Sequence, residues 1–160
     1  SPAITVTADD DAAIRQLYAR ASQAMDSGAE NGAALSRLFT NDGVLLDTWT
    51  SKVYTGTEQI TAFARGASGP GNGKSPTSMN QFIWTVKVEA SPQGATAKAY
   101  VMTGMPPDGT RPLTMTNAGQ YWDDLVKTAD GWRVKKRVFY RVSQVAPPTQ
   151  TAVVATGGPR

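Results

Sequence analysis

The sequence contains neither cysteine nor histidine among its 160 residues. Without cysteine the chain can form no disulfide, thiolate nucleophile, zinc ribbon or iron–sulfur centre. Without histidine it can have no Ser-His-Asp or Cys-His catalysis and no imidazole metal ligand. Acid–base chemistry must therefore come from carboxylates, lysine or tyrosine. We expect no metal at the functional site, because hard cations need several carboxylates close together.

Long hydrophobic runs are also missing. None approaches the ~20 residues of a membrane-spanning helix, so we expect no membrane partner. The charge is nearly balanced, with 16 basic and 13 acidic side chains. The basic residues gather late, from Arg133 to Arg141, without any motif of a nucleic-acid-binding fold. We interpret them as the charged face of a strand and expect no nucleic-acid partner.

The length is that of one domain, which buries about 70% of its unfolded surface. We expect an N-terminal extension over 1–8, a domain over 9–143 and a tail over 144–160 that is rich in Pro, Thr and Gly. The first residue is Ser1, which fits a removed leader as well as other processing. The compartment is left open: cytoplasmic, or exported if a leader was removed.

Helix signals dominate the first half. Acidic residues precede apolar residues at helical spacing and predict a helix over 9–28, ended by Gly28. A short helix is expected over 31–39, and another from an N-cap at Thr57 to about Arg65.

Strand signals dominate the second half. A turn at 40–43 should precede short strands at 44–49 and 53–55, and four long strands are expected over 78–90, 94–105, 112–128 and 131–144. Helices followed by an antiparallel sheet predict an α+β fold, with a hollow on the concave side of a curved sheet. On the last strand, alternation places Trp132, Val134, Val138 and Tyr140 opposite Arg137 and Arg141.

Two carboxylates are candidate bases. Asp47 lies inside a strand beside Leu45 and Trp49, where partial desolvation would raise its pKa. Asp26 lies in the last turn of the first helix, where the dipole disfavours an anion. The alternatives are a strand-end Asp47 that binds turn amides and a solvated Asp26 that initiates a turn.

Tyr121 and Asp123 share one strand face, and Arg137 and Arg141 share a face of the next strand. Cross-strand charge pairing on an exposed sheet explains this pattern. If the face is concave, the same residues form the polar floor of a pocket.

Several short motifs, in this order, carry a resemblance to a known family: Ala13–Tyr18, Ala24–Gly28, Leu38–Gly43, Tyr54–Ile60, Gly119–Asp123 and Asp130–Val134. Together they resemble the SnoaL-like branch of the nuclear transport factor 2-like superfamily. The resemblance implies a cone-shaped, curved mixed sheet packed with three helices around a central pocket. It also implies a homodimer or higher homo-oligomer.

The resemblance implies two different sites. Hexachlorocyclohexane dehydrochlorinase and bile-acid dehydratase relatives use an Asp–His dyad, whose Asp matches Asp26. The His position falls at Met79 or Asn80, neither of which is a base. Arg137 matches an arginine of the dehydrochlorinase pocket.

Ketosteroid isomerase gives the other mapping. Its general base falls on Asp47, and its protonated oxyanion-hole Asp falls near Asp123. Its Tyr donor falls at Ala21, so Tyr18 or Tyr121 would have to replace it.

We therefore expect a lyase or isomerase of the dehydratase or proton-transfer type, without a cofactor, acting on a small, partly apolar molecule. Asp47 or Asp26 would move the proton, and Arg137, Tyr18 or Tyr121 would stabilise negative charge. Trp49, Met79, Asn80 and Asp123 complete the expected substrate-binding set. Two alternatives stay open: a binding module without catalysis, and an accessory protein that dimerises through its sheet.

Overall fold

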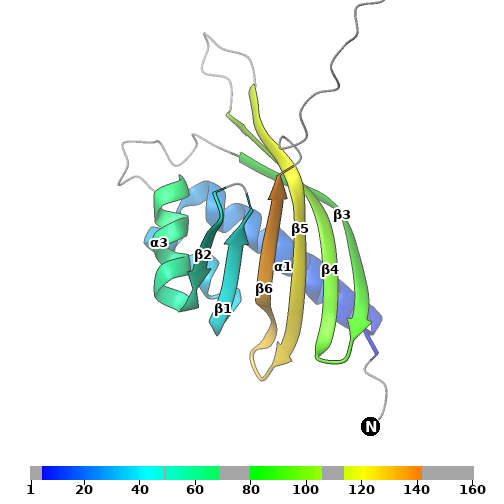
Figure 1. The fold of residues 1–160 in the computed structure, drawn as a ribbon. Coiled ribbons are helices and arrows are strands. Elements are labelled where there is room, and N and C mark those ends of the chain that lie inside the picture. Colours follow the sequence, from blue (N-terminus) through cyan, green and yellow to red (C-terminus); the bar gives the residue numbers. More distant parts are fainter. Residues whose placement is uncertain (1–4, 49, 69–79, 106–113, 142–160) are drawn as a thin grey trace, which may run out of the picture.

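Three helices and a six-stranded mixed sheet make up the fold in the computed structural model, which describes residues 5–48, 50–68, 80–105 and 114–141 (Figure 1). The helical elements are α1 (Ala8–Ser27), the 3-10 turn η1 (Ala29–Gly32), α2 (Ala33–Ser36) and α3 (Gly56–Ser68). The strands are β1 (Phe39–Asp47), β2 (Lys52–Thr55), β3 (Asn80–Ser91), β4 (Gly94–Met105), β5 (Thr114–Thr128) and β6 (Gly131–Arg141). The expected α+β class is confirmed.

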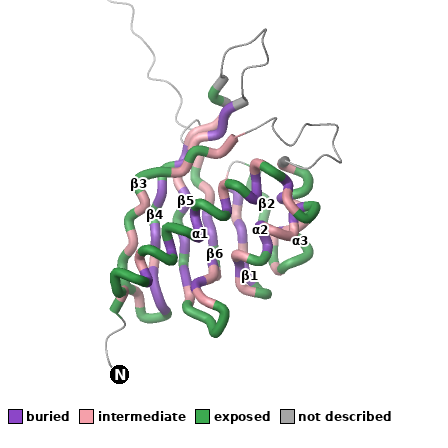
Figure 2. The backbone as a smooth tube through the Cα atoms, turned by 180° about the vertical axis from the view of Figure 1, so that it is seen from behind, coloured by how far each residue is buried: buried purple, intermediate pink, exposed green. Residues whose placement is uncertain are grey.

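The strands follow the order β2-β1-β6-β5-β4-β3, and the sheet does not close. Only the pairing of β1 with β6 is parallel, while the other neighbours are antiparallel. Helix α1 crosses one face of the sheet, and α3 lies beside β1 and β2 (Figures 1 and 2). This arrangement turns one sheet face toward the helices and leaves the other toward solvent.

Helix α1 begins where the sequence predicts. Thr7 and Asp10 form a capping box: the Thr7 hydroxyl accepts from the Asp10 main-chain N–H at 3.1 Å, and Asp10 accepts from the Thr7 N–H at 3.2 Å. Asp10 also accepts from Lys127 and Trp132, and these bonds, that of Lys127 first, lower its pKa. Gly28, with φ of 61°, ends the helix in the left-handed conformation.

The core lies between α1 and the sheet. Ile14 and Leu17 on the buried side of α1 belong to one cluster with Leu125, Trp132 and Val134. The buried stretches of the central strands run behind α1 in Figure 2. This apolar layer fixes α1 against the sheet and so positions the polar side chains of α1, Tyr18 and Asp26, relative to the strands.

Two irregularities correct the predicted strand pattern. Strand β1 begins at Phe39 and runs through the expected turn at 40–43, with a register shift between Phe39 and Val44. In β6, Val134 pairs with Leu125 and Lys136 pairs with Asp124, which leaves Lys135 as the extra residue of a bulge.

The β6 bulge reverses the alternation of the strand. Trp132 and Val134 therefore lie on the core side together with Arg137, not opposite it as predicted. Tyr140 is exposed, as its predicted place opposite Arg141 requires. Lys135 forms an ion pair with Asp42 of β1, which links the two irregular segments.

The helix limits also differ from the prediction. Helix α3 starts at Gly56, so Thr57 lies inside the helix instead of capping it. The helix expected over 31–39 consists of η1 and α2 and ends at Ser36, where β1 soon follows. The predicted tail over 144–160 lies outside the described residues, as do Trp49 and Met79. None of the described helices is long and apolar enough to cross a bilayer.

Candidate functional site

A closed cluster of three side chains lies deep between α1 and the sheet. The Tyr18 hydroxyl donates to Asp123 Oδ2 at 2.5 Å. Arg137 donates to the same carboxylate from Nε at 2.9 Å and from Nη2 at 2.6 Å. Asp123 and Arg137 are only 2% and 3% exposed. Asp123 therefore acts as an acceptor only, and the role of a protonated oxyanion-hole donor does not fit this geometry.

Burial and neighbouring charge govern this cluster. Burial, aided by Asp123, raises the pKa of Tyr18, so its phenol stays neutral and directed at Asp123. Burial alone would lower the pKa of Arg137, but Asp123 raises it on balance. Tyr18 therefore cannot donate the same proton to a substrate, which removes it from the expected charge-stabilising set.

One donor group of Arg137, the Nη1 amino group, is not used in the bonds to Asp123. Its Nε and Nη2 are bound to Asp123, whereas Nη1 makes no hydrogen bond to any described residue. The guanidinium lies over the Tyr121 ring, with Cζ 4.1 Å from the ring centroid. A cation held in this way keeps its carboxylate, and its Nη1 stays without a hydrogen-bond partner among the described residues.

The second cluster is open and centres on Asp26 at the end of α1. Asp26 Oδ1 accepts from the Gln81 main-chain N–H at 2.7 Å, and Oδ2 accepts from Asn80 Nδ2 at 3.3 Å. Burial raises the pKa of Asp26, and the Gln81 and Asn80 bonds only partly offset this rise. A carboxylate of this kind binds a proton more tightly than a solvated one.

Gln81 connects Asp26 to Tyr121. Its side-chain amide donates to the Tyr121 hydroxyl at 3.3 Å. The hydroxyl oxygen accepts this bond, and its own proton finds no acceptor among the described residues. Burial raises the pKa of Tyr121, so the phenol is a neutral donor.

Asp47 belongs to a third group. It is 5% exposed and accepts from Arg141 Nη2 at 3.1 Å, while Arg141 Nη1 donates to Asn117 at 2.9 Å. Asn117 in turn donates to Thr103 at 3.1 Å. The burial of Asp47 agrees with the desolvation expected for it, and the arginine that pairs with it is Arg141.

The sheet register explains these partnerships. In the sheet register, Arg137 lies between Leu45 on β1 and Asp123 on β5. Its neighbour on β1 is therefore a buried leucine, and its neighbour on β5 is the carboxylate. Asp47 lies two residues further along β1, level with Phe139. Sequence reasoning missed Gln81 and Asn117. Alternation from the expected position of Met79 would have placed Gln81 on the same strand face.

Asp26 is accessible from a hollow of about 530 Å³ between α1 and the edge strand β3, whose lining also includes Tyr18, Ser22, Gln81 and Ile83. A cavity of this size suits a small molecule. Within the described ranges, no group of three or more carboxylates stands close enough to hold a metal ion.

A family model for the SnoaL-like domain matches residues 6–138. The chain belongs to the SnoaL-like family. No curated protein sequence matches this SnoaL-like chain. The expected family is therefore confirmed by a match that spans most of the sequence.

Solved structures share the fold at low sequence identity. Aln2 from a Streptomyces species is 21% identical, with a TM-score of 0.72 over 87% of this chain and 95% of its own. An NTF2-like protein with a cystatin-like fold from Novosphingobium aromaticivorans is 23% identical, with a TM-score of 0.70 over 86% and 85%. A candidate scytalone dehydratase from the same species is 19% identical, with a TM-score of 0.66 over 83% and 84%. These similarities establish an NTF2-like cone fold for this SnoaL-like chain.

Proposed function

We propose that this SnoaL-like protein is a lyase or isomerase that needs no cofactor and uses Asp26 to take a proton from a small, partly apolar molecule. One observation carries the proposal. Of Asp26, Asp47 and Asp123, only Asp26 forms no ion pair with a lysine or arginine of the described residues. Burial raises its pKa, which makes Asp26 a stronger base than a solvated carboxylate.

Two donors are available for the negative charge that develops when the proton leaves. The Tyr121 hydroxyl proton and Arg137 Nη1 are both unused by the described residues. Fixed donors in a buried site stabilise such charge without reorganisation. The carbonyl or other acceptor group of the substrate would accept from them while Asp26 holds the proton. The fold likeness to a candidate scytalone dehydratase supports a dehydratase-type reaction.

Proton exchange tests the proposal without knowledge of the product. The protein is incubated in D2O with a panel of small cyclic ketones and β-hydroxy ketones, and deuterium at the carbon beside the carbonyl is followed by NMR. Wild type should exchange at least one of these compounds. D26N should abolish exchange, because an amide cannot take the proton. Y121F should slow it about 100-fold, the usual effect of losing one such donor.

The matched control is D124N, which removes an exposed carboxylate beside Asp123 and should leave exchange unchanged. Exchange that survives in D26N but fails in D47N would transfer the role of base to Asp47. Ligand binding without exchange in wild type would favour the alternative of a non-catalytic binding protein. That alternative is supported by Asp47 and Asp123, both of which are already neutralised by arginine.

We also propose that the outer face of the sheet is a self-association surface. Large side chains are exposed there on four neighbouring strands: Phe82, Trp84, Tyr100, Trp122 and Tyr140. Register aligns Trp84, Tyr100 and Tyr140 in one row across the sheet, with Gln120 between the tyrosines. A set of large exposed aromatic side chains on one sheet face is typical of an interface. Sedimentation of wild type and of a W84E/Y100E variant tests this, with the variant expected to be monomeric.

A further inference from the structure

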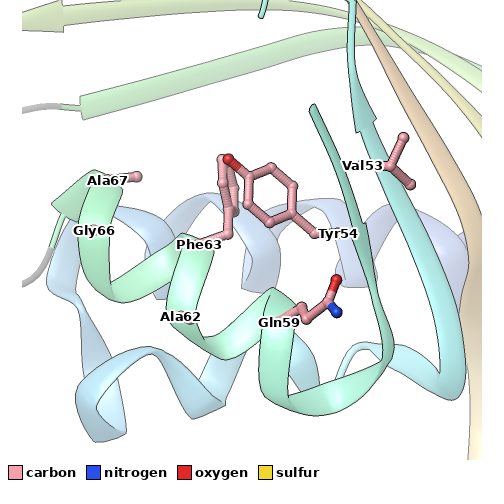
Figure 3. Close-up of a pocket in the computed structure, with 7 residues that line it drawn as sticks. All are labelled: Val53, Tyr54, Gln59, Ala62, Phe63, Gly66 and Ala67. Atoms are coloured by element: carbon pink, nitrogen blue, oxygen red, sulfur yellow. The ribbon is translucent and has the colours of Figure 1, made fainter. Parts of the chain in front are cut away.

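The structure contains a second hollow that the proposed reaction does not use. It measures about 590 Å³ and lies between α3 and the edge strand β2 (Figure 3). Its walls include Val53 and Tyr54 from β2 and Gln59, Ala62, Phe63 and Gly66 from α3. None of these residues belongs to the Asp26, Asp123 or Asp47 clusters.

An aromatic pair gives this hollow an apolar wall. The rings of Tyr54 and Phe63 lie side by side in Figure 3, with centroids 4.8 Å apart and planes tilted by 49°. The Tyr54 hydroxyl makes no hydrogen bond to a described residue. At Gly66, an added Cβ would meet no atom within 4 Å, so the helix side of the hollow is open. A flat apolar molecule can pack on such a surface.

The edge of β2 adds one main-chain donor and one acceptor. The Thr55 N–H points away from β1, because it donates to Gln59 Oε1 at 2.8 Å. In an antiparallel pair the direction of the main-chain N–H and C=O groups alternates from residue to residue. The main-chain groups of Tyr54 therefore point toward β1, and those of Val53 point toward the free edge. Neither the Val53 N–H nor its C=O makes a hydrogen bond to a described residue on that side. Unpaired main-chain groups of this kind are available to a ligand.

The length of the free edge decides what can bind. Lys52 begins the strand and pairs with Asp47, and Gln59 already occupies the edge at Thr55. Only the Val53 position is left, which gives a single donor–acceptor pair. An added peptide strand uses several such pairs in succession. The edge therefore suits a small molecule with one amide-like group better than a peptide.

We propose that this hollow, lined by Val53, Tyr54 and Phe63, is a second binding site for a flat, mostly apolar small molecule with an adjacent donor and acceptor, such as a lactam. The ring of the ligand packs on Tyr54 and Phe63, and its amide group pairs with the Val53 main chain. The site is separate from the proposed catalytic site. In the sheet register, buried Leu45 stands between Tyr54 and Arg137.

Amide chemical shifts of the full chain, titrated with quinolin-2(1H)-one, test the proposal. The expected result is a saturable shift of the Val53 resonance and its neighbours on α3, without a shift at Gln81 or Tyr121. The N-methyl analogue lacks the donor and should bind about 3- to 10-fold more weakly, the value of one neutral hydrogen bond.

Ala62 offers a way to close the hollow, since its side chain lies on the wall that α3 contributes. A62W should eliminate the shifts, whereas A13W, at an exposed position of α1, should leave them unchanged. D26N should also bind the lactam normally, which separates this site from the proposed reaction. Absence of saturable shifts, shifts centred on Gln81, or equal binding of the N-methyl analogue would each overturn the proposal.

Discussion

Asp123 and Asp26 are linked through a short series of contacts, yet their surroundings are opposite. Asp123 binds Arg137, whose guanidinium lies over Tyr121, and Gln81 joins Tyr121 to Asp26. Asp123 receives a guanidinium and a phenol, whereas Asp26 receives only a main-chain N–H and an amide from the described residues. The first carboxylate is neutralised by its partners, and the second carries its charge without a cation from that part of the chain.

This difference separates a carboxylate with a structural role from the one that we propose as the base. A buried ion pair is costly to break, because the remaining charge loses its compensation. A half-buried carboxylate without a cation gives up stability but gains basicity. We therefore expect mutations at Asp123 to act mainly on folding and mutations at Asp26 to act mainly on the proposed proton transfer.

The largest effect should come from D123N, which leaves the buried Arg137 without its carboxylate. We expect a loss of about 3–5 kcal/mol in the free energy of unfolding, measured by urea denaturation. The exposed neighbour gives the control, since D124N should change stability by no more than ~0.5 kcal/mol. A loss under ~1 kcal/mol in D123N would contradict the structural role of the pair. D123L/R137M, which removes both charges, should recover much of the loss.

Next in size is Y18F, which removes the phenol that donates to Asp123 at 2.5 Å. A hydrogen bond to a charged group contributes about 1.5–3 kcal/mol, so unfolding should become easier by that amount. Y140F is the matched control, because Tyr140 is 42% exposed on the outer face. Equal stability of the two variants would contradict a stabilising hydrogen bond between Tyr18 and Asp123.

A smaller change in stability is expected for Q81M. This variant keeps the main-chain N–H that binds Asp26 but loses the side-chain bond to Tyr121, which should cost about 0.5–1.5 kcal/mol. Proton exchange should fall by a larger factor, because the Tyr121 hydroxyl is then free to rotate. If the rate of exchange falls only as much as the loss in the free energy of unfolding accounts for, Gln81 supports only the fold and does not position Tyr121.

The smallest effect on stability should be that of D26N, within ~0.5 kcal/mol of wild type. Its sign is informative. Burial raises the folded-state pKa of Asp26 above the unfolded value, so wild-type stability falls as pH rises between the two. D26N should therefore be slightly the more stable protein at neutral pH. This advantage should disappear in acid, where Asp26 is protonated in both states, as denaturation curves across the pH range can measure.

Much of the fold could be predicted from local signals. The start and end of α1, the existence of the long strands and the α+β order follow from capping residues, glycines and alternation, which act over a few residues. The bulge at Lys135 could not be predicted in this way. It requires the β5 register, and it moves Trp132 and Val134 to the side of Arg137.

The candidate site was predictable in residue type but not in partnership. Asp47 or Asp26 was expected in one site with Tyr121, Asp123 and Arg137. The structure connects Asp26 to Tyr121, Arg137 and Asp123 through Gln81, and it pairs Asp47 with Arg141 instead. Gln81 was not expected, although it is the residue that joins two of them. Its main-chain N–H binds Asp26 and its side chain binds Tyr121, and no sequence pattern predicts that one residue does both.

The sequence by itself determined which chemistry is available. With no histidine or cysteine, any acid–base chemistry is left to carboxylates, lysines and tyrosines, and this follows from side-chain pKa values alone. Tertiary structure decided which carboxylates are paired with a cation. Two arginines on β6 could each neutralise an aspartate, and the strand register assigned Arg137 to Asp123 and Arg141 to Asp47. Ion pairing depends on distances of a few ångströms, which only the folded sheet fixes, and among the described residues it left Asp26 without a cation.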